Sequence, residues 1–174
     1  MGKVRPPRHD HGSFDIRIAR DGSWHYQNSP INRKELVCLF ASVLRREPNG
    51  DYVLETPVER GTIVVEDAPF IAVELFWKNE AGRQVISFRT NLDEMVTADP
   101  EHPIRVQIDP QTREPRPYVM VRAGLEARIS RAVFYELVAL AEAEQLSGHQ
   151  VLGVWSEGMF FPIDQMTQQE LAAE

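Results

Sequence analysis

The chain has 174 residues, 43% of them hydrophobic and 26% charged, which is typical of a globular protein of one ordinary domain or two small ones. No apolar run approaches the roughly 18 residues that a spanning helix needs, so we expect no membrane insertion. The formal net charge of −7 argues against binding extended nucleic acid. The single cysteine, Cys38, excludes an internal disulfide, and a cytoplasmic location is therefore the expected default.

The N-terminal residues 1–12 lack apolar periodicity and are predicted to be a disordered tail. His9-Asp10-His11 offers two imidazoles there but no ordered third ligand, so we expect no metal site. Phe14, Ile16 and Ile18 then alternate with polar residues, which predicts a half-buried strand. Asp21-Gly22 is a turn signal, and Trp24–Tyr26 is predicted to be the returning strand of a hairpin.

The first predicted helix begins with Asn32 as its N-cap and with Glu35 placed to complete a capping box. Its apolar positions follow the helical period and indicate one face toward the core: Leu36, Leu39, Phe40, Val43 and Leu44. Pro48-Asn49-Gly50 ends the segment.

The middle of the chain is rich in β-branched and aromatic residues separated by proline and glycine, which predicts successive strands. The predicted strands are Tyr52–Thr56, Thr62–Glu66, Phe70–Trp77, Arg83–Thr90, Ile104–Ile108 and Tyr118–Val121. Because they do not alternate with crossover helices, we expect an α+β fold with mainly antiparallel sheets.

The second predicted helix begins at Ser130 as N-cap, and Gly148 lies where a left-handed C-terminal residue would be needed. A hairpin, Val151–Trp155 with Met159–Ile163, is predicted to follow. Thr167-x-x-Glu170 then predicts a short last helix.

One local pattern occurs twice. Ile-x-Arg followed by Glu-Leu-Val-x-Leu occupies residues 31–39, and both parts recur, with a different offset, between Ile129 and Leu140. The repeat predicts duplicated β–helix–β units in which the helices from about Asn32 and Ser130 hold equivalent places. We therefore expect an N-terminal repeat over residues 13–66 and a C-terminal repeat over residues 67–174.

Catalytic and metal signatures are missing from the sequence. It has no His-Glu-x-x-His, no paired cysteines and no glycine-rich phosphate loop, and Ser156 lacks the flanking glycines of a nucleophile elbow. Two acidic runs remain, Thr56-Pro57-Val58-Glu59-Arg60 and Val65-Glu66-Asp67-Ala68-Pro69-Phe70. Each places carboxylates beside a proline, and both acid–base work and structural pairing with arginines stay open for them.

Several motifs in combination resemble the proteobacterial DUF1285 family, over nearly everything from residue 13 to 164. They are Asp21-Gly22-x-Trp24, Ser29-Pro30-Ile31-x-Arg33, the two acidic runs, Arg122-x-Gly124-Leu125-Glu126-Ala127-Arg128-Ile129-x-Arg131 and Gly153-Val154-Trp155-Ser156-x-Gly158-x-Phe160-Phe161. The resemblance implies a cytoplasmic protein of unassigned function with a duplicated α+β fold. It also implies a C-terminal part superficially like pleckstrin-homology barrels, a nucleotide-like ligand in an inter-domain cleft and a role in signal transduction.

The leading functional hypothesis is a non-catalytic binding protein for a small anionic ligand of the nucleotide type, without a cofactor or metal, held between the repeats. Arg122, Arg128 and Arg131 would bind phosphate, because guanidinium groups are bidentate donors. The other candidate site residues are Thr56, the acceptors Glu59, Glu66 and Asp67, and the stacking rings Tyr118 and Trp155. The alternatives are a metal-assisted hydrolase that uses the central carboxylates, and a protein-interaction domain whose partner is unknown.

Overall fold

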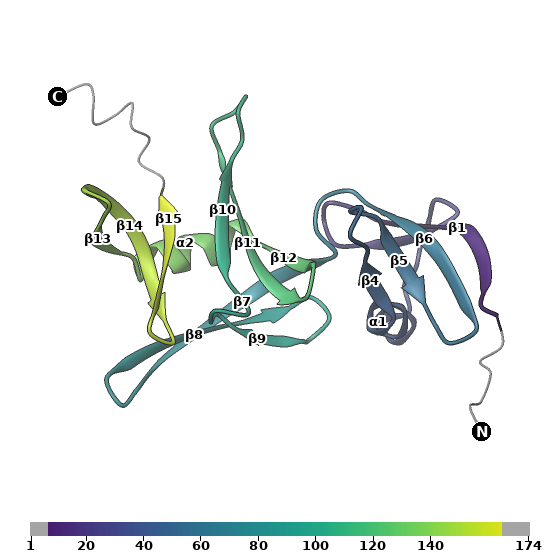
Figure 1. Ribbon diagram of the computed structural model, residues 1–174, viewed down its shortest axis with the longest axis horizontal. Coiled ribbons are helices and arrows are strands. Elements are labelled where there is room, and N and C mark those ends of the chain that lie inside the picture. The colour runs from purple at the N-terminus through teal and green to yellow at the C-terminus, as the bar shows by residue number, and fades with distance from the viewer. Residues whose placement is uncertain (1–6, 165–174) are drawn as a thin grey trace. The chain divides into compact units, whose positions relative to one another are not determined.

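A computed structural model describes residues 7–164, which form two compact units (Figure 1). The N-terminal unit comprises residues 7–69 with 123–125, and the C-terminal unit comprises residues 70–122 and 126–164. The chain is mostly β, and each unit has one nine-residue helix among its described residues. The last helix expected from Thr167-x-x-Glu170 lies outside the described residues. None of the described helices is long and apolar enough to span a membrane.

The N-terminal unit is built on a six-stranded sheet of order β3-β2-β1-β6-β5-β4. Its strands are β1 (His9–Ile18), β2 (Trp24–Tyr26), β3 (Ser29–Pro30), β4 (Leu44–Arg46), β5 (Tyr52–Glu55) and β6 (Glu59–Val65). Two antiparallel meanders are joined by the one parallel pair, β1 with β6. The expected hairpin of β1 and β2 is present, with Ile18 opposite Trp24 and both side chains buried.

The first strand begins at His9, inside the segment predicted to be a tail. His9 and Asp10 are in register with Glu59 and Arg60 of β6, and the amide of His9 donates to the carbonyl of Val58 at 2.8 Å. Apolar periodicity could not indicate this pairing, because residues 7–12 are exposed and β1 is held there by backbone hydrogen bonds and charged side chains.

The first helix, α1 (Lys34–Ser42), begins one residue later than the sequence indicates. Arg33 rather than Asn32 is the N-cap, and its side chain makes no capping hydrogen bond, so the predicted capping box is wrong. The buried helical residues are Val37 and Ala41, whereas Leu39 of the predicted apolar face is 61% exposed. Val43 and Leu44 lie beyond the helix, in its C-cap and in β4.

The C-terminal unit contains a second six-stranded sheet, of order β10-β11-β12-β7-β8-β9, and a three-stranded sheet, β13-β14-β15. The strands are β7 (Phe70–Glu80), β8 (Arg83–Thr90), β9 (Met95–Thr97), β10 (Ile104–Ile108), β11 (Pro115–Arg122), β12 (Leu125–Ile129), β13 (Glu142–Leu146), β14 (His149–Ser156) and β15 (Met159–Asp164). Its core contains the fully buried side chains of Phe70, Ile86, Phe88 and Leu137.

The second helix, α2 (Arg131–Ala139), begins as the sequence predicts. Ser130 is the N-cap, and its hydroxyl accepts a hydrogen bond from the amide of Val133 at 3.3 Å. The predicted role of Gly148 is wrong, because α2 ends nine residues before it. Glu142–Leu146 instead pairs with β14, and Ser147-Gly148, both with positive φ, form the two-residue turn between these strands.

The repeated sequence pattern corresponds to a repeated order of elements. In each unit a three-stranded meander leads into a nine-residue helix, and a second meander follows: β1–β3, α1, β4–β6 in the first copy and β10–β12, α2, β13–β15 in the second. The first and last strands of each copy are neighbours, β1 beside β6 and β10 beside β15. The duplication is therefore visible in the order of the elements, and the β7–β9 meander precedes the second copy. That the backbones of the two copies superpose stays a prediction.

Candidate functional site

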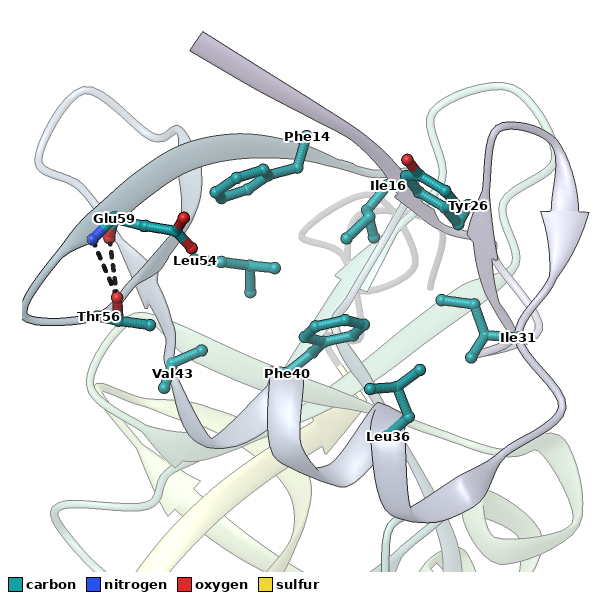
Figure 2. Close-up of a pocket in the computed structure, with 10 residues that line it drawn as sticks. All are labelled: Phe14, Ile16, Tyr26, Ile31, Leu36, Phe40, Val43, Leu54, Thr56 and Glu59. Carbon is teal, nitrogen blue, oxygen red and sulfur yellow. Dashed lines mark hydrogen bonds between the residues drawn. The ribbon is translucent and has the colours of Figure 1, made fainter. Parts of the chain in front are cut away.

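The N-terminal unit holds a cavity of about 470 Å³ between α1 and the facing strands, which we name the α1 pocket. Figure 2 shows its apolar wall, in which Phe14 and Ile16 come from β1, Leu36 and Phe40 from α1, and Leu54 from β5. Ile31 and Val43, which flank α1, also line it. This volume and this lining of apolar and aromatic side chains are typical of small-molecule sites.

Three residues with polar groups, Tyr26, Thr56 and Glu59, complete the α1 pocket. The turn between β5 and β6 positions Glu59, because the hydroxyl of Thr56 accepts from the Glu59 amide at 3.0 Å (Figure 2). The Thr56 amide also donates to the Glu59 carbonyl at 2.8 Å. The carboxylate of Glu59 is 53% exposed, and its Oε1 lies 3.3 Å from Nε2 of His11. Thr56 and Glu59, both predicted from the sequence, therefore lie in one pocket.

The aromatic wall of this pocket is held by contacts behind it. The ring of Phe14 lies over Gly61, where a Cβ would come within 2.5 Å of two ring carbons, so only glycine leaves room for the ring in this position. The ring of Phe40 stacks on the buried Trp24 at 6.3 Å between centroids. Both rings are thus positioned by the fold before any ligand arrives.

The C-terminal unit holds a second cavity, of about 290 Å³, which we name the arginine pocket. Arg128 at the end of β12 and Arg131 at the start of α2 both line it, together with Glu114, Phe134 and Tyr135. Pro115, Pro117 and Ile129 close the remaining wall. Two of the three predicted phosphate-binding arginines therefore share one pocket.

Arg131 is oriented by an aromatic neighbour one helical turn away. Its Nε donates to the hydroxyl of Tyr135 at 2.9 Å, and its guanidinium carbon lies 5.8 Å from the centroid of that ring. The hydrogen bond with Tyr135 raises the pKa of Arg131 above its ordinary value, and the charge of Glu114 acts in the same direction. Arg131 is consequently a fixed positive charge with a defined orientation.

The predicted acceptor Glu66 is engaged within the N-terminal unit. Its carboxylate accepts from the backbone amide of Arg20 at 3.0 Å and from Nη1 of Arg17 at 2.7 Å. The Arg20 amide, followed by the Arg17 guanidinium, holds the pKa of Glu66 below its ordinary value. For Glu66 the geometry favours the structural ion pair that the sequence left open, and Asp67 follows it in the same bend.

The predicted stacking rings have protein neighbours of their own. Tyr118 is 4% exposed, and the guanidinium carbon of Arg105 lies 4.3 Å from its ring centroid. The indole Nε1 of Trp155 donates to Glu144 at 3.2 Å, and its ring lies 5.3 Å from that of Phe160. Neither ring is among the described residues that line the two pockets.

The third predicted arginine, Arg122, lies with its guanidinium carbon 5.5 Å from the centroid of Phe70 and its Nε 3.6 Å from Glu94. Arg122, Arg128 and Arg131 belong to one unit, and Glu59, Glu66 and Asp67 belong to the other. Convergence of these two groups on a common ligand stays a prediction.

Sequence reasoning missed most of the α1 pocket. Phe14 and Ile16 are predicted on the buried face of a strand, and Leu36 and Phe40 on the buried face of a helix. Such periodicity indicates a buried face without telling whether that face is filled. Glu114 is not among the candidate residues that the sequence indicates. The signal that could have found it is the proline-rich connection that contains it, since such loops carry functional residues.

Potential metal ligands do not gather in the described part of the chain. No group of three or more His, Cys, Asp or Glu side chains among residues 7–164 is placed to hold an ion. The rings of His9 and His11 lie 4.4 Å apart at exposed positions of β1. The deeply buried Ser156 also has a structural role, since its hydroxyl donates to the carbonyl of Ala98 at 2.7 Å and accepts from the amide of Ile86 at 2.9 Å.

Comparison with solved structures finds similar proteins, two of which belong to one family. A DUF1285 family protein from Silicibacter pomeroyi DSS-3 is 45% identical, with a TM-score of 0.83 over 99% of this chain and 93% of that one. A DUF1285 family protein from Shewanella baltica OS155 is 23% identical, with a TM-score of 0.55 over 72% of this chain and 91% of that one, and it shows a likeness of fold. A search of curated proteins finds no match.

Family models agree with these structural relatives. The N-terminal domain of DUF1285, a domain of unknown function, matches residues 3–68, and the C-terminal domain of DUF1285, a protein of unknown function, matches residues 69–163. Together the two models cover nearly the whole chain, and the chain therefore belongs to the DUF1285 family.

Proposed function

We propose that this protein is a non-catalytic binding protein whose arginine pocket takes a small anionic ligand of the nucleotide class. The observation that carries the proposal is the position of Arg128 and Arg131 on one cavity of about 290 Å³ at the start of α2. Guanidinium groups bind phosphate through two parallel hydrogen bonds, and the amides at a helix start add to the attraction for an anion.

The aromatic members of the pocket suit the remainder of such a ligand. Phe134 and Tyr135 line the same cavity as the two arginines, and rings of this kind stack on planar groups such as bases. Tyr135 is 59% exposed, so its ring has an accessible face. A phosphate on the arginines with a base against these rings is the arrangement that we propose.

Glu114 has a defined part in this proposal. Glu114 lines the pocket, and its negative charge acts on Arg131. An incoming phosphate must compete with it, because like charges that share a site repel each other. Glu114 therefore tunes the affinity downward.

Isothermal titration calorimetry with pyrophosphate, AMP, ADP and adenosine tests the proposal. We expect the phosphate-bearing ligands to bind more tightly at low salt, Arg128→Ala and Arg131→Ala to weaken them about tenfold, and Glu114→Gln to strengthen them. Arg83→Ala is the matched control, because Arg83 pairs with Glu157 at 60% exposure outside the pocket. Absence of binding at millimolar ligand, or an equal loss in Arg83→Ala, would refute the proposal.

The proposal extends to the properties that the family resemblance implies. These are an α+β fold whose C-terminal half is superficially like pleckstrin-homology barrels, a cytoplasmic location and a part in signal transduction. The resemblance in sequence supports them, together with the order of β10–β12, α2 and β13–β15 for the C-terminal half. Cell fractionation of the tagged protein tests the location directly.

A further inference from the structure

The α1 pocket has a chemical character different from that of the arginine pocket. Its wall is made almost entirely of aliphatic and aromatic side chains, and two phenylalanine rings face it, from Phe14 on β1 and Phe40 on α1 (Figure 2). None of the described residues that line it is lysine, arginine or histidine, and Glu59 is the one acid among them. The pocket thus combines an apolar interior with a single negative charge.

That charge is placed at the entrance. The carboxylate of Glu59 is 53% exposed, whereas Ile16 and Leu54, deeper in the wall, are 6% and 5% exposed. His11 contacts the carboxylate through Oε1 only, at 3.3 Å, which leaves Oε2 for a ligand. A molecule that fills the pocket would place an apolar body inside and a polar group at Glu59.

Nearby positive charges are committed to other acids. Arg8 pairs with Glu55, and Arg60 pairs with Glu47 and lies 3.6 Å from Asp10. The carboxylate of Glu59 is therefore not neutralised by these arginines. An anionic group at this entrance would be repelled by Glu59, and an anion placed deeper would lose its hydration without a partner.

The acceptor chemistry of Glu59 determines the matching ligand group. An ionised carboxylate accepts hydrogen bonds and donates none, so the partner must be a donor. A protonated amine provides both donors and the opposite charge, and aromatic faces attract such a cation as well. The two phenylalanine rings favour an apolar body that carries an aryl or alkyl group.

From these observations we propose that the α1 pocket is a second ligand site, for a small apolar molecule with one terminal amine that binds Glu59. The site shares no lining residue with the arginine pocket, because all of its lining residues lie in the N-terminal unit. Its occupant is an organic cation, in contrast to the anion proposed for the C-terminal unit.

Three probes that share one skeleton test this proposal on the full chain: phenylpropylamine, phenylpropanol and phenylpropanoate, measured by calorimetry. We expect the amine to bind about five- to tenfold more tightly than the alcohol and the acid to bind most weakly. Glu59→Gln should bring the amine to the affinity of the alcohol. Glu35→Gln, the same change at an exposed position of α1 outside the pocket, should leave the preference intact.

A second pair of variants separates binding in the cavity from binding elsewhere. Leu36→Trp places a larger ring in the space for the ligand and should weaken amine binding, whereas Leu39→Trp, on the exposed side of the same helix, should not. Equal binding of the three probes, no binding at millimolar concentration, or equal losses in Glu59→Gln and Glu35→Gln would overturn the proposal. Glu59 is half exposed, so Glu59→Gln stays informative even where Leu36→Trp fails to fold. Pyrophosphate titrations report on the arginine pocket separately.

Discussion

Replacement of Ser156 by alanine should destabilise the C-terminal unit more than any other single hydroxyl deletion that we consider. Ser156 is fully buried and joins three segments, because its hydroxyl donates to the carbonyl of Ala98 at 2.7 Å and accepts from the amide of Ile86 at 2.9 Å. Alanine leaves that amide and that carbonyl buried without this partner. An unsatisfied buried donor costs about 1–3 kcal/mol, so with the carbonyl the loss should be about 2–4 kcal/mol.

Urea unfolding followed by circular dichroism measures this loss, and hydrogen exchange locates it. The midpoint for the C-terminal unit should fall while the slope of free energy against urea is retained, since the surface exposed on unfolding is unchanged. In NMR exchange experiments the Ile86 amide should lose protection first, because its acceptor is the deleted hydroxyl.

Ser87→Ala is the matched control on β8. The Ser87 hydroxyl bonds that of Thr97 at 2.8 Å, and both residues are only partly buried, so water can replace either partner. This control should cost about 1 kcal/mol or less. If Ser156→Ala matched Ser87→Ala, or if Ile86 kept its protection, the assigned bridging role of Ser156 would be wrong.

Three further changes test the N-terminal unit. The pKa of Glu66 is lowered in the folded state, so its contribution to stability is present above the ordinary pKa and is lost as pH falls through the folded pKa. Glu66→Gln should therefore flatten the dependence of the unfolding midpoint on pH in acid. An unchanged slope of midpoint against pH would contradict this. Gly61→Ala forces a Cβ to within 2.5 Å of the Phe14 ring and should cost about 1–3 kcal/mol in urea unfolding, with Phe14→Leu relieving part of the loss. A chain that starts at Ser13 loses the Arg8–Glu55 ion pair and the pairing of His9 with β6, but it loses no buried side chain, because residues 7–12 are all exposed. Its free energy of unfolding should therefore fall by only about 1–2 kcal/mol. A larger fall would show that this segment is essential to the sheet.

Much of the fold is predictable where a residue type strongly favours one local structure, as glycine does in a turn and serine at the start of a helix. The Asp21-Gly22 hairpin is predictable because glycine adopts positive φ easily, and Gly22 has a φ of +84° in the structure. The Ser130 cap is predictable because a hydroxyl before a helix accepts from its free amides. The cap at Asn32 failed although its residue type is favourable, since α1 begins at Lys34 after an extended Arg33. Local propensity places a helix, but tertiary packing decides its first residue.

Strands without apolar alternation escaped prediction for a related reason. β13 (Glu142–Leu146) has four exposed residues of five and is held by its backbone pairing with β14. The exposed start of β1 at His9 depends in the same way on β6. Sequence periodicity detects a strand through the face that it buries, so an edge strand with no buried face gives no signal.

The candidate site was predictable by charge and not by shape. Arginine clustering near Ser130 led to Arg128 and Arg131, which do share a pocket, because residues just before and after a helix start are close in space. The α1 pocket is not predictable from the sequence. Whether Leu36 and Phe40 pack tightly or border a cavity depends on how far α1 stands from the sheet, and residue types do not encode that distance.

The two pockets each border the helix of a repeat but use different strands, β1 and β5 for the α1 pocket and β11 and β12 for the arginine pocket. The isoleucine of each Ile-x-Arg motif lines a pocket, Ile31 beside α1 and Ile129 beside α2. The arginine of the motif differs in use, since Arg131 lines its pocket and Arg33 does not line the α1 pocket. Glu59 supplies the charge in the first copy, so α1 borders a pocket with one acid, whereas α2 borders a pocket with two arginines and Glu114. This difference in charge should keep one ligand from binding both pockets, and each probe series should then respond only to variants of its own unit.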